Sequence, residues 1–360
     1  MAGRDPALLV TSDLNRTRTT GASIGDGEPL AEWREFDLGM WDGMRPEEIR
    51  RRYPDIQSER FGSGDFQPEG GERFSEFTDR VRGAFDILIA RIDDGEEAIA
   101  VTHGGVIQTI VGSLIGAVDQ SAMLVPSNAS LTTIRLSGDR AEVSSLNDDL
   151  HLEGDAARPS GTRLRFIRHG QTVANLERRW WGRGESPLSD EGRRQALALA
   201  QVGGAYDAFA SSPSARARDT AVAVAGDSEA VQIVDDLAEL NFGEWEGLTG
   251  AEARDADPEA FRRIFEEGRD EPRGRTGESF AGAGERFESA AAKLAANGAG
   301  TVGVFTHGGV TRAYVARLLG IPFSNRDVLP IPRNTSHSEI IFGGSGPRIS
   351  SYNVAAHLGD

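Results

Sequence analysis

The sequence predicts an α/β fold built from two tandem three-layer α/β/α domains, each with a mainly parallel sheet and a C-terminal hairpin. Three observations predict it. Apolar, strand-like runs alternate with helical stretches, as in parallel sheets covered by helices. Blocks of sequence from the first half recur in order in the second half. The length of 360 residues suits two domains.

The recurring blocks indicate a tandem duplication. Five pairs of segments match: 11–20 with 211–220, 35–43 with 239–247, 101–106 with 305–310, 126–130 with 332–336, and 144–147 with 350–353. Their offset rises only from 200 to 206 residues, so few insertions separate the two copies. We therefore expect a domain at 1–152, a linker of small and polar residues at 153–162, and a second domain at 163–360.

The first copy is predicted to be truncated at its N-terminal side. The second copy has 51 residues at 161–211 ahead of Ser212, whereas 11 residues precede the matching Ser12. Three interpretations are open. The coding sequence starts upstream and Met1 is an internal codon; or the first copy is a degenerate domain packed on the second; or it binds a phosphorylated ligand through Arg16 and His103 as a regulatory site.

The elements of the second copy follow from its apolar periodicity and end signals. Ser189 is a plausible N-cap for one helix, and Pro258 suits the first turn of another. In order, we expect a strand at 163–168, a helix at 191–202, a strand at 208–212, helices at 259–267 and 279–296, a strand at 301–306, a helix at 309–319, and hairpin strands at 338–342 and 348–352.

Composition excludes several classes of protein. Asp and Glu number 56 against 39 Lys and Arg, and the net charge of −17 argues against general binding to nucleic acid or to an anionic membrane. The absence of cysteine excludes disulfides and thiolate chemistry. No apolar run resembles a membrane span or a secretory signal, so we expect a cytoplasmic protein.

Two arginines and two histidines of the second copy lie where parallel strands should end, and an acid, Glu239, lies beside a Gly-Trp turn. Arg168 ends one predicted strand and His169 follows it, while His307 follows another. Because the carboxyl ends of parallel strands share one edge, we expect these residues to converge there with Arg216 and Glu239. Such a cluster of cations needs an anion, and Arg binds phosphate well. A metal ion fits poorly beside two arginines, and no cofactor is predicted.

These residues lie in motifs that resemble a known family. The motifs are Leu164–Asn175, which contains Arg-His-Gly, then Ser212–Ala221, Glu239–Gly247 and Thr306–Gly309. In this order, from residue 163 to about 352, they resemble the histidine phosphatase superfamily with its phosphoglycerate-mutase-like fold. The first copy keeps only a vestigial set without Arg-His-Gly, namely Arg16, Glu35 and His103. Without the nucleophile, its phosphoenzyme route would be closed.

The resemblance implies a role for each residue of the second copy. His169 would be the nucleophile that forms a phosphohistidine, and Glu239 would give a proton to the leaving alkoxide. Arg168, Arg216 and His307 would hold the phosphoryl oxygens. The implied substrate-binding residues are Gly170, Gln171, Asn175 and Gly308.

The length of one segment predicts the reaction. The acid and the second histidine are 68 residues apart in both copies, from 239 to 307 and from 35 to 103. The resemblance implies that mutases carry a longer segment there, so we expect a metal-independent phosphatase for small phosphorylated metabolites. Mutase-type phosphoryl transfer and a non-catalytic phospho-ligand-binding or scaffold role are the alternatives. We also consider an intramolecular pseudo-dimer of the two copies.

Overall fold

The chain divides into two compact units. The structure, a computed structural model, describes residues 6–53, 65–116, 122–138, 140–152, 160–202, 204–298 and 300–358. The units are Met1–Ser113 and Leu114–Asp360. This division differs from the domain boundary predicted from the repeat, because the C-terminal hairpin of the first copy belongs to the second unit. Residues 153–159 of the predicted linker lie outside the described residues.

The first unit contains a small parallel sheet with strand order β2-β1-β3. Its strands are β1 (Leu8–Ser12), β2 (Glu28–Leu30) and β3 (Ala98–Val101). Its helices are α1 (Asn15–Gly21), α2 (Pro46–Arg52), α4 (Phe74–Ile89) and the first part of α5 (Gly104–Ile115). An aromatic cluster that includes Phe36, Phe66 and Phe77 packs beside α4 and supplies apolar burial.

Among the described residues, β3 is the edge strand of the first sheet, and all four of its residues are half-buried. Its counterpart in the second copy is a central strand, buried at every position but the first. That counterpart pairs with β7 on one side and, on the other, with the strand at 162–168, which lies in the segment with no match in the first copy. Within the described residues, the first sheet therefore lacks the pairing that the second sheet has on this side.

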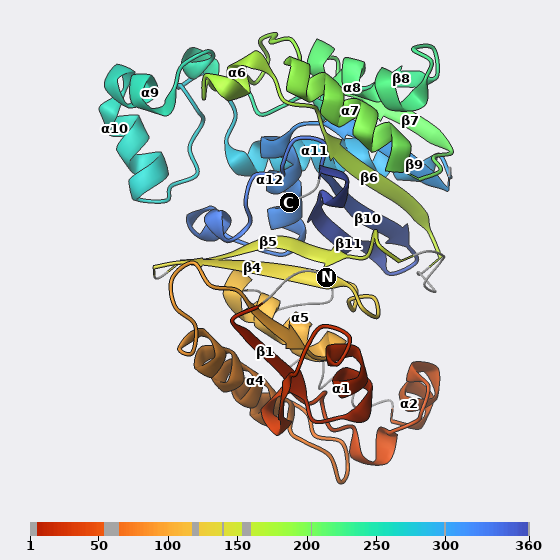
Figure 1. The fold of residues 1–360 in the computed structure, drawn as a ribbon. Helices are drawn as coiled ribbons and strands as arrows, with labels where there is room; N and C mark the ends of the chain where they lie inside the picture. Colours follow the sequence, from red (N-terminus) through yellow and green to blue (C-terminus); the bar gives the residue numbers. More distant parts are fainter. Residues whose placement is uncertain are drawn as a thin grey trace. The chain divides into compact units, whose positions relative to one another are not determined.

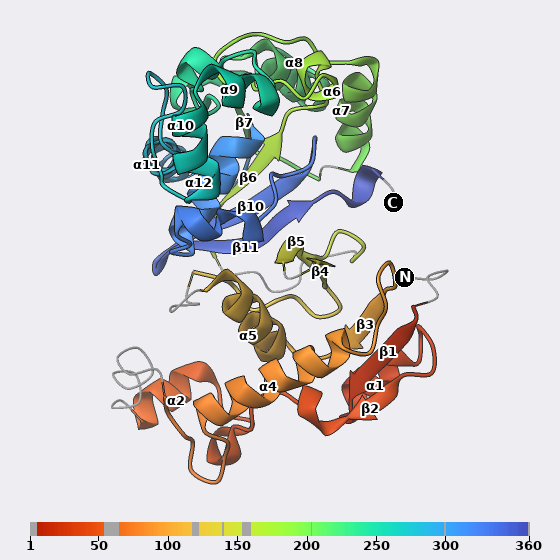
Figure 2. The same cartoon turned by 90° about the vertical axis from the view of Figure 1, so that its left-hand side faces the viewer.

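The second unit is a three-layer sandwich, which confirms the predicted fold class (Figures 1 and 2). Four parallel strands form one end of its sheet: β6 (Thr162–Arg168), β9 (Thr301–Thr306), β7 (Ala208–Ser211) and β8 (Val231–Ile233). The predicted hairpin, β10 (His337–Gly343) and β11 (Gly346–Val354), adds antiparallel strands beside β6.

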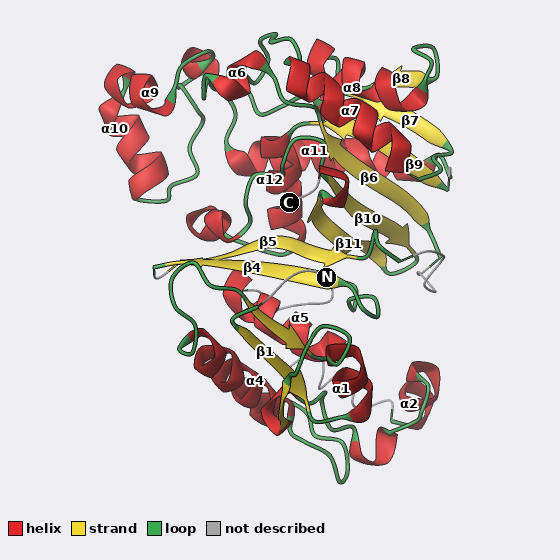
Figure 3. Cartoon of the chain, viewed as in Figure 1, coloured by secondary structure: helices red, strands yellow, loops and turns green. Residues whose placement is uncertain are grey.

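Helices cover both faces of this sheet (Figure 3). One face carries α7 (Asp190–Val202) and α8 (Ala215–Ala225), with the short α6 (Val173–Leu176) near the strand ends; the other carries α11 (Phe280–Ala296) and α12 (Gly308–Leu318). Ser279 caps α11 by accepting the N–H of Gly282. Between the sheet and α7 and α8, a core forms from Ile167, Leu199, Ala221, Val231 and Phe305.

The helix predicted at 259–267 is divided in the structure. It follows α9 (Gly250–Ala256) and consists of α10 (Pro258–Phe261) and a π-helical turn at Arg262–Glu266. The Asp257 carboxylate accepts the N–H of Ala260 and so starts α10 at Pro258. The turn places Ile264 in a core cluster with Trp245, so packing outweighs regular helix geometry here.

Two further strands extend the second sheet beyond its own hairpin. These are β4 (Leu131–Ser137) and β5 (Arg140–Asp148), and the full strand order is β4-β5-β11-β10-β6-β9-β7-β8. By sequence they are the C-terminal hairpin of the first copy, yet β5 pairs with β11 of the second. The strands lie side by side in Figures 1 and 2.

None of the helices in the described residues combines the length and apolar character needed to cross a membrane.

Candidate active site

Three neighbouring parallel strands bring the predicted residues to one edge of the sheet. His169 follows β6, His307 follows β9, and Ser212 follows β7. Ladder hydrogen bonds continue past the strand ends: the His169 N–H donates to Thr306 O at 3.0 Å, and the Ser212 N–H to Phe305 O at 2.9 Å. The β6-β9-β7 order thus fixes the three side chains against one another.

The imidazole of His169 is held in one tautomer. Its Nδ1 lies 2.7 Å from the carbonyl oxygen of Gly170, and because a carbonyl only accepts, Nδ1 carries the proton. The Nε2 lone pair is therefore free. Burial, followed by the charges of Arg168 and Arg216, holds the pKa of His169 well below its usual value of 6.5. A neutral ring with a free Nε2 is competent as a nucleophile.

The ring of His307 faces that of His169, with the centroids 5.1 Å apart and the planes at 65°. Its Nε2 is 2.7 Å from the Ser212 hydroxyl, while its buried Nδ1 has no hydrogen-bond partner among the described residues. Burial, with the nearby charge of Arg216, also holds the pKa of His307 well below 6.5. A buried polar atom without a partner is costly, so Nδ1 marks a place for a ligand atom.

Two arginines beside the histidines are held by carbonyl oxygens. Arg168 donates from Nη1 to Pro332 O at 2.7 Å, and its Nε is buried without a hydrogen-bond partner in the described part of the chain. Burial lowers the pKa of Arg168 to about 10, which leaves it charged at neutral pH. Arg216, 2% exposed, donates to the carbonyls of Gly182 and Gly184 at 2.9 and 2.8 Å. Carbonyls do not neutralise these charges, so the site attracts an anion.

The carboxylate of Glu239 is fixed at the start of α12. It accepts the N–H groups of Gly309 at 2.9 Å and of Val310 at 2.8 Å, and its own neighbour Leu240 donates a third at 2.8 Å. A helix N-terminus favours a carboxylate at this position. Burial lowers the pKa of both Arg168 and Arg216, and the charge of Glu239 opposes this lowering at each, so the carboxylate belongs to the same cluster.

The two glycines predicted to contact substrate make room for protein atoms. A Cβ on Gly170 would overlap the carbonyl of Gly192, where the turn after β6 packs against α7. A Cβ on Gly308 would overlap Ile331 and would lie 3.2 Å from Nε of Arg168. Both glycines therefore permit the close packing that positions His169 and Arg168.

Gln171 and Asn175, predicted to contact substrate, both support the turn that carries His169. The Gln171 side-chain oxygen accepts the Ser189 hydroxyl at 2.9 Å. Asn175 forms a capping box with Thr172 at the start of α6. Its Oδ1 also accepts from Asn334 Nδ2 at 3.2 Å, and Asn334 donates to His169 O at 2.9 Å.

The predicted set omits three residues that the structure places in the cluster. They are Ser212, which bonds His307, Gly309, which bonds Glu239, and Asn334, which bonds the His169 carbonyl. The internal repeat carried a signal for each, because Ser12, Gly105 and Asn128 occupy the matching positions of the first copy.

The first copy places two of its three predicted residues as the second copy does. His103 Nε2 lies 2.8 Å from the Ser12 hydroxyl, and Glu35 accepts the Gly105 N–H at 3.0 Å. Arg16 differs from Arg216, because it is exposed and its Nε donates to His103 Nδ1 at 3.2 Å. No counterpart of His169 faces this set within the described residues.

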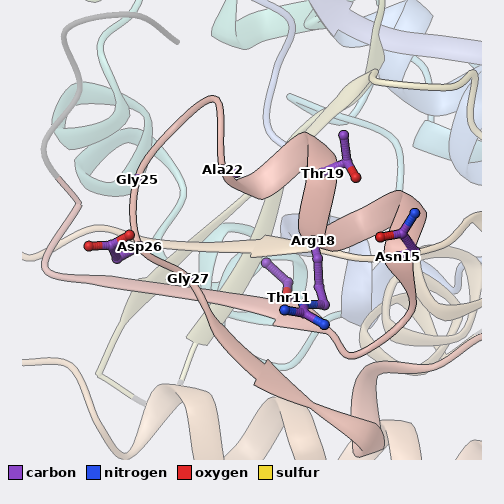
Figure 4. Close-up of a pocket in the computed structure, with 8 residues that line it drawn as sticks. All are labelled: Thr11, Asn15, Arg18, Thr19, Ala22, Gly25, Asp26 and Gly27. Atoms are coloured by element: carbon purple, nitrogen blue, oxygen red, sulfur yellow. The ribbon is translucent and has the colours of Figure 1, made fainter.

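A hollow of about 380 Å³ lies elsewhere in the first unit (Figure 4). Its lining comes from β1, α1 and the loop that follows: Thr11, Asn15, Arg18, Thr19, Ala22, Gly25, Asp26 and Gly27. It contains none of the predicted site residues. Within the described residues, no group of three or more His, Asp or Glu side chains is arranged to hold a metal ion.

The chain resembles known proteins along most of its length. A model of the histidine phosphatase superfamily (branch 1) matches residues 1–149 and 164–355. The bifunctional protein Rv2228c of Mycobacterium tuberculosis is 48% identical over 130 residues, which are 34% of this chain and 35% of that protein. The chain thus spans about a third of the length of the first curated relatives it matches.

Two further similarities cover about half of the chain. Glucosyl-3-phosphoglycerate phosphatase of Mycolicibacterium vanbaalenii is 36% identical over 178 residues, or 46% of this chain and 78% of that protein. The solved structure of Bacillus stearothermophilus YhfR is 31% identical, with a TM-score of 0.50 over 55% of this chain and 99% of that one.

Proposed function

The chain belongs to the histidine phosphatase superfamily, and we propose on this premise that it is a metal-independent phosphomonoester hydrolase with His169 as its nucleophile. One observation carries the proposal. The buried atoms Arg168 Nε and His307 Nδ1, which have no hydrogen-bond partner in the described part of the chain, lie beside an imidazole whose Nε2 carries no proton. A phosphoryl group is an anion that satisfies such donors while its phosphorus faces the nucleophile.

In the first step, Nε2 of His169 attacks phosphorus. The N–P bond forms as the ester P–O bond breaks, and the departing alkoxide takes a proton from the carboxyl group of Glu239. Arg168 and Arg216 stabilise the charge on the phosphoryl oxygens. With the Ser212 hydroxyl donating its hydrogen bond to Nε2 of His307, Nδ1 of that ring carries the proton and is a further donor to the same oxygens.

In the second step, the Glu239 carboxylate takes a proton from water. The water oxygen bonds to phosphorus as the N–P bond breaks, which releases inorganic phosphate and restores neutral His169. Glu239 suits both steps because three backbone N–H groups hold it in one position. The low pKa of His169 supports the same assignment, since only the neutral ring can attack.

We propose small phosphorylated metabolites as substrates. Relatives of which most of the length is covered include a glucosyl-3-phosphoglycerate phosphatase and a metal-independent phosphoserine phosphatase, and they support an ester of this class without naming the substrate of this chain. The prediction of a cytoplasmic location rests on the lack of a signal-like or membrane-spanning apolar run in the sequence, and the prediction of no binding to nucleic acid rests on the net charge.

The test is hydrolysis of p-nitrophenyl phosphate and a panel of sugar phosphates and phosphoglycerates, with EDTA present. We expect release of phosphate by the wild type and a loss of at least about 10³-fold in His169→Ala. His103→Ala is the matched control, since it removes the equivalent of His307 from the first copy, and it should retain activity. Folded protein that releases no phosphate from any ester would contradict the proposal. Transfer between phosphoglycerates without release would favour the mutase alternative.

A further inference from the structure

Strands β5 and β11 meet through equivalent residues. Their pairing is antiparallel, with Leu146 opposite Tyr352. The repeat aligns residues 144–147 with 350–353, so these two residues are each other's counterparts. In an antiparallel pair, equivalent residues face each other only where a two-fold axis passes between them. A local two-fold axis therefore runs through this pair.

The side chains next to the axis follow the same symmetry. Asn147 donates from Nδ2 to the carbonyl of Ser350 at 2.6 Å. Asn353 donates from Nδ2 to the carbonyl of Ser144, also at 2.6 Å. Asn147 corresponds to Asn353, and Ser144 to Ser350, so the two bonds exchange under the two-fold. Reciprocal contacts of this kind define an isologous interface, the type found in symmetric dimers.

Each asparagine is also fixed on its own side of the interface. Asn147 and Asn353 adopt left-handed backbone conformations, with φ of 53° and 55°, which asparagine tolerates better than most residues. Their Oδ1 atoms accept the N–H groups of Ser127 and Arg333, each at 2.7 Å, and these two are counterparts as well. Both β5 and β11 thus carry the same preformed asparagine arrangement for pairing with the other strand.

We propose that the β11 edge is a self-complementary pairing surface, occupied in this chain by β5 and able to accept β11 of a second copy of this chain when the hairpin β4–β5 is displaced. Without β5, the part of the edge around Tyr352 would present N–H and C=O groups to another strand. Ile349 would stay paired with the segment 122–124, because its N–H donates to Ala122 O at 2.7 Å and its carbonyl accepts the Leu124 N–H at 2.9 Å. In the two-chain pairing, Asn353 of each copy would donate to Ser350 of the other, and Tyr352 would lie on the axis. Within one chain, the pairing of β5 with β11 takes the place of this contact between two chains.

The absence of cysteine from the chain allows a clean cross-linking test. Val143 and Leu146 of β5 are 1% and 7% exposed, so Val143→Asp with Leu146→Asp should release the hairpin. Adding Tyr352→Cys to this variant should give a disulfide-linked dimer with twice the monomer mass by light scattering. Tyr352→Cys alone should stay monomeric with a free thiol, because β5 covers the position.

A cysteine on the other edge of the same sheet controls for random collision. Ile233 of β8 is 47% exposed, and Ile233→Cys in the released variant should cross-link far less than Tyr352→Cys. Near-UV circular dichroism establishes that each protein is folded. A released variant that is folded but remains monomeric, or that cross-links equally through position 233, would overturn the proposal.

A reversible disulfide between β5 and β11 tests the proposal if the aspartate variant does not fold. Leu146→Cys with Tyr352→Cys places two thiols at a directly paired position. In the oxidised protein the disulfide ties the hairpin to β11, and the chain should remain monomeric after mild denaturant is added and removed at high protein concentration. The reduced protein should form dimers after the same treatment. Monomers in both states, with hydrogen exchange showing that the reduced hairpin opens, would refute the proposal.

Discussion

The carboxylate of Glu239 accepts the backbone N–H of Gly309 at 2.9 Å, at the first turn of α12. The first copy repeats the relationship, with Glu35 accepting the N–H of Gly105 at 3.0 Å. In both copies the glycine leaves space for the acid, since a Cβ on Gly309 would lie 2.7 Å from Oε1 of Glu239. The acid and the second histidine are thus held by one helix start, and each copy offers a matched control for the other.

Gly309→Ala should displace Glu239 and lower kcat. The carboxylate must give up its bond to the helix N-terminus or move away from the new methyl group, and a misplacement of this size costs on the order of 10²-fold in rate. Steady-state hydrolysis of p-nitrophenyl phosphate measures the effect. Gly105→Ala makes the same change beside Glu35 and should leave kcat unchanged. An equal loss in both variants would indicate a general effect on folding.

Arg216→Lys should reduce activity even though it preserves charge. The guanidinium of Arg216 donates to the carbonyls of three residues in one loop, Trp181, Gly182 and Gly184. An ammonium group cannot reproduce that planar geometry. We expect kcat/KM to fall by roughly 10²-fold, the scale for loss of a transition-state donor. Arg16→Lys is the control, since Arg16 is exposed, and its kcat/KM should match wild type. Full activity in Arg216→Lys would show that charge alone suffices.

Thr220→Val should destabilise the second unit. The buried Thr220 hydroxyl accepts the Gly170 N–H at 3.0 Å and donates to Arg216 O at 2.7 Å, so it joins the turn after His169 to α8. Valine leaves the Gly170 N–H without a partner, a cost of about 1–3 kcal/mol in the free energy of unfolding. Urea unfolding measures this loss. Thr20→Val removes the exposed counterpart and should change stability by less than about 0.5 kcal/mol.

The strands of the second copy could be predicted because their signals are local. The apolar run at 301–306 coincides with β9, and the strand predicted at 163–168 lies within β6. The motif residues reach one edge because parallel strands end together, which order and spacing alone indicate. The structure adds what holds each side chain, such as the carbonyls around Arg216, since loop backbone carries no sequence signal.

The partner of the first copy's hairpin could not be predicted in this way. Residues 131–148 match a hairpin that, in the second copy, pairs with β6, and the repeat alone assigns them to the first domain. An edge strand pairs through its backbone, so its sequence does not specify which sheet it joins. The reciprocal bonds of Asn147 and Asn353 specify it, and they become visible only when both strands are placed.

Stability should fall as the pH falls below 6.5, and His337 should account for part of the loss. Burial, with the charge of Arg165, lowers the pKa of His337 to about 4 from the usual 6.5. Between these values the unfolded chain binds a proton that the folded chain excludes, so acid favours unfolding. His337→Leu should reduce the drop in unfolding free energy between pH 7.5 and pH 5 by about 2 kcal/mol, as measured by urea unfolding. His151→Leu, at an exposed position, should leave the drop unchanged. A drop of the same size in His337→Leu and wild type would assign the pH dependence to other groups.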